Sequence, residues 1–368
     1  MKVVAQKADL VQALTTASRA VSSRSSIQVL SGVLLDARED GAAIAATDME
    51  ISIKAPLTGV VERAGAVVLP ARIAIDIARN APLSDVTIEQ KPGESQVEIR
   101  SGESQFVLQS LPAADFPQLP VLPAEQGFKL KKQGLLETID RVSSSASRDE
   151  TRPVLTGVLV HVSKSSVKMV ATDSYRLSVK ETPLETGVAE RVEAIVPARS
   201  LVELSRIGQA ADAEEVAIVA TENQVLFEVG GVVLTSRLID GQFPNYQQLL
   251  PESFEYEVVI GKGELTEVVH RIGLLAQRNS PLRLKFTSGT LTVAAESQDV
   301  GRARESLPVR YEGDELEIGF NPEFLEAGVA SVSGDAVHMK FISPLRPALL
   351  TGENDDFLYL IMPIRLTD

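Results

Sequence analysis

Several residue types that support common chemistries are absent or scarce in this chain. Cysteine and tryptophan do not occur among its 368 residues, and histidine occurs three times. Without cysteine there can be no disulfide, no thiolate nucleophile and no cysteine-ligated zinc. The N-terminal stretch is too polar for a signal peptide, and no run approaches the roughly 18 apolar residues of a membrane span. We therefore expect a cytoplasmic chain without membrane contact.

A surplus of basic residues is also missing. The formal net charge is −14, whereas most DNA-binding proteins carry excess cations because phosphate contacts dominate their affinity. Net charge does not exclude a local basic surface, because the field depends on how charge is distributed as well as on its sum. An acidic exterior with a basic lining would suit a protein that surrounds DNA, so the total charge decides nothing.

Catalytic motifs are scarce as well. His161, His270 and His338 have no short spacing to carboxylates in a known catalytic pattern. Ser165–Lys168 fits the Ser-x-x-Lys pattern of penicillin-binding enzymes but lacks the companion motifs. No phosphate-binding loop, Gly-x-Gly-x-x-Gly motif or cluster of metal ligands is present. We expect no catalytic residue, no cofactor and no metal site.

The chain does contain strong internal similarity. Val29–Leu35 matches Val154–Val160, 125 residues further along the chain, and Ala46–Asp48 matches Ala171–Asp173 at the same offset. Further matches pair Ile51–Lys54 with Leu177–Lys180, Pro70–Arg72 with Pro197–Arg199, and Phe116-Pro117 with Phe243-Pro244. A fainter third copy contains Leu282–Val293 and Gly319–Pro322. This period far exceeds the roughly 20–50 residues of solenoid repeats, so it predicts three whole domains of similar fold.

We expect these domains at residues 1–120, 128–248 and 253–368, with proline-rich linkers between them. Helical periodicity predicts a first helix in each copy, around Leu10–Val21, Leu136–Val142 and Leu265–Leu275. A shorter second helix is expected around Ile73–Arg79, Leu201–Ile207 and Phe324–Val329. Alternating segments such as Glu50–Lys54 predict strands. The expected fold class is α+β, with two helices packed on antiparallel sheet in each domain.

Asp48 and Asp173 recur at corresponding places in the repeats. A Thr-Asp pair at the end of a strand is more typical of a turn that hydrogen-bonds its own backbone than of a catalytic carboxylate. We therefore expect a turn at both positions.

Three motifs, correctly placed along the chain, resemble one known family. Ala171–Leu177, Phe243–Tyr246 followed by Leu250-Pro251, and the terminal Met362–Leu366 are similar to the bacterial beta sliding clamps. These are non-catalytic processivity subunits of DNA polymerase III. The resemblance implies the DNA clamp fold and a head-to-tail homodimer, in which each chain forms half of a closed ring around double-stranded DNA. Helices would line the hole, and sheets would form the outer wall.

The resemblance also implies a cleft between the second and third domains that binds a short extended peptide. Its partners would be the polymerase III catalytic subunit, the clamp loader, other polymerases and repair proteins. Carried over by motif, the cleft residues are Leu155, Thr172, Tyr175, Arg176, Leu177, Pro244, Leu249, Pro344, Arg346, Leu360, Met362, Pro363, Ile364 and Arg365. Gln247 and Gln248 stand where the family often has basic residues, which leaves the charge preference for the peptide open. Alternatively, Leu155 and Leu177 are simply core residues.

Arginines recur at corresponding positions of the repeats. Arg24, Arg148 and Arg278 follow the first helix of each copy, with Arg152 just beyond, and Arg72 and Arg199 begin second helices. Such a lining would bind phosphate loosely and without reading sequence. We expect these six arginines to contact DNA. The alternative is solvated arginines paired with local carboxylates.

The interface between two copies is expected to pack Phe106 and Leu108 of one chain against Ile272 and Leu275 of the other. Glu296 and Asp299 are candidates for its acidic rim. Phe106–Leu108 could equally be an interior strand, and the family likeness favours the interface. A rival function is a repeat-built protein-interaction scaffold that never touches DNA; such a scaffold could be monomeric.

Overall fold

The computed structural model describes residues 1–22, 25–120, 127–184, 191–276, 280–297, 299–353 and 356–366. The first repeat contains β1 (Lys2–Gln6), α1 (Lys7–Ala17), β2 (Gly32–Arg38), β3 (Gly41–Thr47), β4 (Ile51–Leu57), β5 (Gly59–Arg63), β6 (Gly65–Pro70), α2 (Ala71–Asn80), β7 (Asp85–Glu89), β8 (Gln96–Ser101), β9 (Ser104–Gln109) and β10 (Leu111–Pro112).

The second repeat contains β11 (Phe128–Lys131), α3 (Lys132–Ser143), β12 (Gly157–Val162), β13 (Ser166–Thr172), β14 (Arg176–Pro183), β15 (Val192–Pro197), α4 (Ala198–Ala210), β16 (Glu215–Ala220), β17 (Gln224–Val229) and β18 (Val232–Arg237). The third contains β19 (Tyr256–Gly261), α5 (Lys262–Gly273), β20 (Leu282–Thr287), β21 (Thr290–Ser297), β22 (Gly301–Pro308), β23 (Leu316–Phe320), α6 (Pro322–Ser331), β24 (Ala336–Phe341), β25 (Ala348–Thr351) and β26 (Phe357–Ile361).

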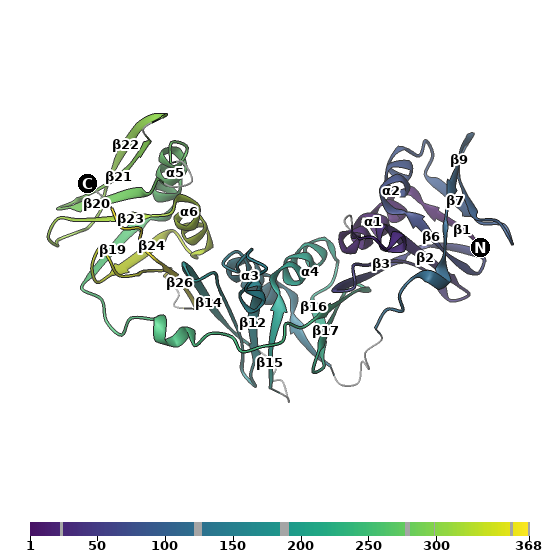
Figure 1. Ribbon diagram of the computed structural model, residues 1–368, viewed down its shortest axis with the longest axis horizontal. Coiled ribbons are helices and arrows are strands. Elements are labelled where there is room, and N and C mark those ends of the chain that lie inside the picture. The colour runs from purple at the N-terminus through teal and green to yellow at the C-terminus, as the bar shows by residue number, and fades with distance from the viewer. Residues whose placement is uncertain are drawn as a thin grey trace. The chain divides into compact units, whose positions relative to one another are not determined.

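The predicted α+β class and the repeating helix pattern are confirmed. Each repeat has two helices at the expected places, and all strand pairs between named strands are antiparallel. Two of the first helices end earlier than the apolar pattern indicated: α1 stops at Ala17 and α5 at Gly273, whereas α3 extends to Ser143, one residue beyond the predicted Val142. Figure 1 shows α1 beside α2 and α5 beside α6, each pair on one face of its own strands.

Backbone contacts divide the chain into two compact units. Unit 1 consists of Met1–Gln133 with Arg199–Leu238, and unit 2 of Gly134–Ala198 with Ile239–Asp368. Each unit contains a sheet that passes from one repeat into the next. In unit 1 the order is β10-β6-β2-β3-β4-β18-β17-β16-β11, and in unit 2 it is β15-β12-β13-β14-β26-β25-β24-β19.

Two smaller sheets stand at the outer repeats. Unit 1 also holds the sheet β5-β1-β7-β8-β9, and unit 2 holds β22-β21-β20-β23. Strands β9 and β22 are therefore edge strands, each with one side that pairs with no strand of the described chain.

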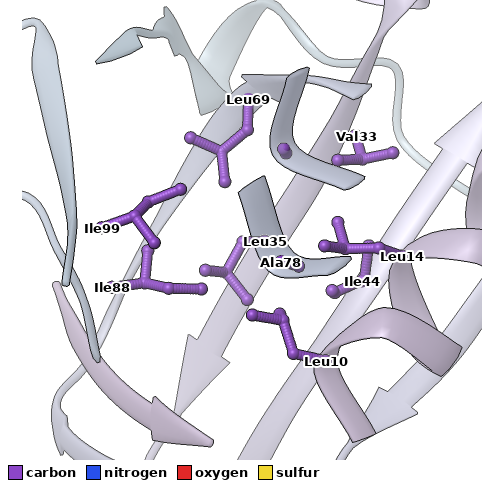
Figure 2. A pocket seen from close by; sticks show the side chains of 10 residues that line it. Leu10, Leu14, Val33, Leu35, Ile44, Leu69, Ala78, Ile88 and Ile99 are labelled. Atoms are coloured by element: carbon purple, nitrogen blue, oxygen red, sulfur yellow. The ribbon is translucent and has the colours of Figure 1, made fainter. Parts of the chain in front are cut away.

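The core of the first repeat is dry and closely packed. Leu10 and Leu14 of α1 meet Val33 and Leu35 of β2 and Ile44 of β3, as Figure 2 shows. The cavity among these side chains has a volume of about 10 Å³, which is no larger than a single water molecule requires. Alternate residues of β2 and β3 point to the other face of the sheet.

The strand-end Thr-Asp pairs form the predicted turns. Thr47 Oγ1 donates to the Ile51 carbonyl at 2.9 Å, and Asp48 Oδ1 accepts the Ile51 amide at 2.9 Å. Met49, between them, has a φ of 79°. Because the side chains satisfy the backbone of the turn, a non-glycine residue is held in the left-handed region.

The same turn corrects one of the sequence matches. Thr172 Oγ1 donates to the carbonyl of Arg176, and Asp173 Oδ1 accepts its amide. Ile51 therefore corresponds to Arg176, and Ser52 to Leu177. The match of Ile51–Lys54 with Leu177–Lys180 is one residue out of register, since it followed a shared Ser-x-Lys spacing across a period-2 strand.

Among the described residues, no helix is both long and apolar enough to cross a membrane.

Candidate functional site

The candidate cleft in unit 2 begins at the turn between β13 and β14. Asp173 Oδ1 accepts the Tyr175 amide at 2.9 Å, and Ser174 has a φ of 80°. This conformation turns the backbone sharply between the strands. The Tyr175 side chain is 61% exposed as a result, and it lies 6.5 Å from the Phe324 ring in a stacked arrangement.

Arg176 is held from three sides. Its Nε donates to Asp173 Oδ2 at 3.0 Å, its guanidinium donates to the Ser144 carbonyl, and its Cζ lies 4.5 Å from the centre of the Phe324 ring. A half-buried guanidinium with a carboxylate and an aromatic face is rigidly oriented. Arg176 therefore shapes the wall of the site, with two of its five N–H donors bonded to Asp173 and the Ser144 carbonyl.

The C-terminal segment closes one side of the site. The Met362 amide donates to the Tyr175 carbonyl at 2.8 Å, and the Ile364 amide donates to the Gly319 carbonyl at 2.8 Å. These two hydrogen bonds fix the tail between the start of β14 and β23. A Cβ at Gly319 would lie 2.6 Å from Leu366 Cδ2 and 3.0 Å from the Ile364 carbonyl oxygen. Only glycine allows the tail to pass this closely.

Helix α6 is fixed to the same site by Tyr359. The Tyr359 hydroxyl donates to the Phe324 carbonyl at 2.7 Å, and its ring lies where a Cβ at Gly328 would be. Burial raises the pKa of Tyr359 to about 12, because the charged phenolate would lose its hydration. Tyr359 thus stays neutral and positions Phe324 beneath Arg176.

Apolar side chains lie under the site. Leu177 of β14 pairs with Leu360 of β26, and both are almost fully buried. They belong to one cluster with Val170, Val179 and Leu349, covered by Leu159, Phe243, Tyr246, Leu250, Phe254 and Leu358. The core interpretation of Leu177 therefore agrees with its burial, and Leu155 is buried as well.

Other predicted cleft residues are exposed around this cluster. Pro244 and Leu249 are exposed in the segment that crosses it, where Tyr246–Leu249 forms a short 3₁₀ helix. Ala348 pairs with Ile361, so the turn that holds Pro344 and Arg346 lies where the tail leaves β26. Among the described residues, neither Arg346 nor Arg365 has a carboxylate within 4.0 Å. Exposed apolar groups with two free cations can bind an apolar peptide that has an acidic flank.

Three residues of this region were not predicted. Gly319 belongs to β23 and Phe324 to α6. Periodicity predicts the element in which each residue lies, but it does not predict that the two residues contact the site. Leu345 is exposed beside Pro344 and Arg346, and its position within a short Pro-rich turn was the available signal.

Of the six arginines predicted to contact DNA, two pair with carboxylates, two have no such pair in the described chain, and two lie outside the described residues. Arg152 pairs with Asp149 at 3.0 Å, and Arg199 pairs with Asp48. Arg72 and Arg148 are exposed and have no carboxylate within 4.0 Å in the described chain. Arg24 and Arg278 lie outside the described residues. The paired arginines are less available to phosphate, because a carboxylate already offsets their charge.

The residues predicted for a dimer interface differ in their exposure to solvent. Phe106 and Val107 are exposed on the edge strand β9, and Leu108 is half-buried. Ile272, by contrast, is only 4% exposed and packs in the core of its own repeat. The prediction that Ile272 lies at the interface surface was wrong. Helical periodicity shows that a position is apolar, but an apolar position can face the core of its own domain or an interface with another chain. Leu274, which is 76% exposed, and the half-buried Leu275 remain accessible.

The described residues contain no cluster of side chains with the make-up of a metal site. No group of three or more His, Asp and Glu side chains there could hold a metal ion. Each histidine instead contacts one glutamate at 3.0–3.1 Å, in the pairs His161–Glu193, His270–Glu326 and His338–Glu257.

Three family models match the chain in order. They describe the N-terminal domain of the DNA polymerase III beta subunit over residues 1–120, its central domain over 129–245 and its C-terminal domain over 247–365. Among curated proteins, beta sliding clamps from Synechococcus elongatus and Streptomyces coelicolor are 34% and 32% identical, with 100% of both chains covered in each case.

Solved structures agree with these matches. The DNA polymerase sliding clamp of Bacillus subtilis has a TM-score of 0.92 and 31% identity, and it is covered over 100% of both chains. The Pseudomonas aeruginosa sliding clamp bound to griselimycin has a TM-score of 0.90 and 30% identity, with the same coverage.

Proposed function

Because this chain belongs to the DNA polymerase III beta subunit family of sliding clamps, we propose that it encircles duplex DNA as a homodimeric ring. The ring tethers the replicative polymerase and other DNA-processing proteins and has no catalytic activity of its own. The observation that carries this proposal is the match of all three clamp domains, in order, along the chain. The domains are those at residues 1–120, 128–248 and 253–368.

The sheet topology supports a head-to-tail dimer. Strand β4, the third of the β2-β3-β4 meander, pairs with β18, the last strand of the second repeat. Strand β14, the third of β12-β13-β14, likewise pairs with β26, the last strand of the third repeat. The equivalent strands still available are β22, the third of β20-β21-β22, and β9.

Pairing β22 of one chain with β9 of its partner would repeat this junction a third time. It would join the sheets of four and five strands into one of nine, as in unit 1. The exposed Phe106 and Val107 on β9 and the exposed Leu274 after α5 would supply apolar contact. Two such heterologous contacts close a ring of two chains if the rotation fits.

The proposed DNA contact is electrostatic and loose. Within the described residues, Arg72 and Arg148 have no carboxylate within 4.0 Å, whereas Arg152 and Arg199 would share their guanidinium groups with Asp149 and Asp48. Phosphate contacts made by a few arginines of a chain with a net charge of −14 would be weak and sensitive to salt. Weak contact suits a protein that must slide while topology keeps it on the DNA.

The cleft in unit 2 is the proposed docking site for partner peptides. The tail residues Met362 and Ile364 expose apolar side chains although their amides are fixed. An extended peptide can place apolar residues against them and an acidic residue near Arg346 or Arg365. Such sites derive most of their binding energy from a few buried anchors.

Primer extension tests the tethering role. A bacterial clamp loader, ATP and polymerase III would copy a long primed circle with excess competitor DNA, so that each polymerase binds once. We expect much longer products with this chain than without it. Removing residues 364–368 should restore the short products, because the tail wall of the cleft is lost.

A chain that never lengthens the products would contradict the proposal, provided that the loader's own clamp does so. A protein-interaction scaffold would behave in this way while it still bound peptides.

A further inference from the structure

Unit 2 buries a charged side chain that lies outside the cleft. Lys180 of β14 is 2% exposed. Its Nζ donates to Asp356 Oδ2 at 2.6 Å and lies 3.6 Å from Glu137 Oε1. Because a lysine is almost never fully buried without a partner, the two carboxylates explain how this ammonium group is accommodated between α3 and the start of β26.

A second cation completes the group. Arg141 of α3 pairs with Glu137 at 2.7 Å, and its Nη1 lies 4.0 Å from Asp356 Oδ1. Its guanidinium also lies 6.0 Å from the centre of the Phe357 ring. Two cations and two anions therefore join α3, β14 and the residue before β26. We call Glu137, Arg141, Lys180 and Asp356 the ionic latch.

The ionic latch and the cleft lie at opposite ends of one strand pair, β14 with β26 (Figure 1). Arg176 pairs with Ile361 at the cleft end, and Lys180 pairs with Phe357 at the latch end. The length of strand between Arg176 and Lys180 is roughly 14 Å. Lys180 therefore acts on the cleft only through the elements that lie between them.

Two paths of contact lead from the ionic latch to the cleft. The Ser144 carbonyl, just after the end of α3, accepts a hydrogen bond from the Arg176 guanidinium. The Met362 amide, just after the end of β26, donates to the Tyr175 carbonyl. A shift of α3 or of β26 on β14 would therefore move the groups that orient both walls of the cleft.

Other polar contacts fix α3 to β14 alone. The hydroxyl oxygens of Thr138 and Thr182 lie 2.6 Å apart, and those of Ser145 and Ser178 lie 2.7 Å apart. Neither pair includes a residue of β26. The ionic latch differs because Asp356 brings the start of β26 into the same set of contacts.

The corresponding junction of unit 1 has no such charges. Strand positions follow from Ile51 and Arg176, which hold equivalent places in the strand pairs β4–β18 and β14–β26. Helix positions follow from Lys7 and Lys132, each of which begins the first helix of its repeat and donates to a carbonyl just after the second helix. On this register, Gln12, Thr16, Ala55 and Gly231 stand where unit 2 has Glu137, Arg141, Lys180 and Asp356. The junction fold therefore forms without the four charges.

Stability alone does not account for the ionic latch. Removing ions from water costs several kcal/mol per ion, and replacing a buried ion pair by apolar residues of similar size is often neutral or stabilising. The best attested use of such buried groups is to favour one register over its alternatives. A slip of one residue between β14 and β26 would separate Lys180 from Asp356 and turn the side chains of the strand to the other face.

We propose that the ionic latch positions the peptide cleft. It holds α3 and β26 in one arrangement on β14, so that the Ser144 carbonyl meets Arg176 and the Met362 amide meets Tyr175. Its four members are positioning residues and do not touch the bound peptide. This inference rests on the proposed role of the cleft in docking partners.

The test removes all four charges from the full chain. The neutral variant carries Glu137→Gln, Arg141→Met, Lys180→Met and Asp356→Asn, which keep side chains of similar size. Because its folding no longer requires the ions to lose their hydration, we expect an unchanged or higher melting temperature. Hydrogen–deuterium exchange of the Met362 amide should nevertheless be about tenfold faster, whereas the amides of β20 and β23 keep their rates.

Binding gives a second readout. Surface plasmon resonance would measure the affinity of a purified bacterial polymerase III catalytic subunit for the immobilised chain. We expect the neutral variant to bind the subunit roughly fivefold more weakly. As a matched control, Lys285→Met with Glu315→Gln removes an exposed ion pair of unit 2 at 2.6 Å and should change neither exchange nor affinity.

Unchanged exchange of the Met362 amide in the neutral variant would overturn the proposal. Faster exchange of every amide in unit 2 would also overturn it, because the ionic latch would then only stabilise the fold. If the neutral variant did not fold, Asp356→Asn alone removes the charge next to β26, and the same comparison at Met362 decides. A wild-type chain that bound no catalytic subunit would count against the proposed function, whereas the exchange of Met362 would still test the ionic latch.

Discussion

The carboxylates of two aspartates at strand ends accept hydrogen bonds from nearby backbone amides and also pair with an arginine. Asp48 and Asp173 each use one carboxylate oxygen for the amides of a turn and the other for an arginine. Such paired use was foreseeable for the turn, because Thr-Asp at a strand end favours local hydrogen bonds. The pairing of Asp48 with Arg199 was not foreseeable, since the two residues are distant in sequence, whereas Arg176 lies three residues after Asp173.

Contacts between residues distant in sequence were not foreseeable at the cleft either. Motif similarity predicted Arg176, Met362 and Ile364 as cleft residues, and the structure bonds Met362 to Tyr175, the residue before Arg176. It could not show that Arg176 lies over Phe324, because periodicity reports which side of its own helix a residue occupies. It says nothing about a ring contact with a distant strand.

Gly319 gives the first prediction for a single residue. Gly319→Ala should push the tail away, because the new Cβ would lie 3.0 Å from the Ile364 carbonyl oxygen, which is backbone and cannot rotate aside. We expect at least a tenfold weaker affinity for a polymerase peptide, about 1.4 kcal/mol, by isothermal titration calorimetry. Gly263→Ala adds a methyl group in open space and should not change the affinity. Equal affinities of both variants would contradict the role given to the tail.

Glu181 gives a prediction about pH. A hydrogen bond from Lys168 and a second from Ser166 lower the pKa of Glu181 below the ordinary glutamate value of 4.5. A lowered pKa in the folded state adds stability that is complete above pH 4.5 and is lost as the pH falls through the folded value. Glu181→Gln should therefore reduce the free energy of unfolding at pH 7 and have a smaller effect at low pH. Urea titrations at both pH values measure this.

Exposed Glu222→Gln serves as the control for Glu181 and should show no such pH dependence. A Glu181 effect that is equal at both pH values would show that the ion pair does not contribute through its charge.

Helices and strands were predicted better than their ends and their partners. The helical faces through Leu10 and Leu265 are present because apolar residues at helical spacing must face a core. The same spacing could not separate the chain's own core from an interface between chains, because both bury apolar side chains. Ile272 was therefore placed at a surface, although it lies in the core of its repeat.

This distinction predicts different effects for Ile272, near the end of α5, and Leu274, just after the helix. Ile272→Ala should lower the free energy of unfolding by about 2–5 kcal/mol because it leaves a cavity. Leu274→Asp should leave the circular dichroism spectrum unchanged but shift sedimentation from dimer to monomer, because the exposed side chain of Leu274 would lie in the proposed interface. A fully dimeric Leu274→Asp variant at micromolar concentration would remove Leu274 from that interface.

For the whole molecule, the repeat was the most informative property of the sequence. An offset of 125 residues predicted three whole domains of similar fold before any element was assigned. The sequence did not reveal that the sheets continue between repeats through β4–β18 and β14–β26. Strand pairing of this kind depends on edge contacts between distant segments, which no local pattern records.

The most direct test of the account asks whether the protein surrounds DNA. The chain would be loaded on a nicked circular plasmid by a bacterial clamp loader with ATP, washed in high salt, and half the sample then linearised. Salt removes proteins held by charge from both forms, whereas a closed ring leaves only over an end. The account predicts retention on the circle and loss from the linear form. Equal behaviour on both forms, with a loader that loads its own clamp, would contradict it.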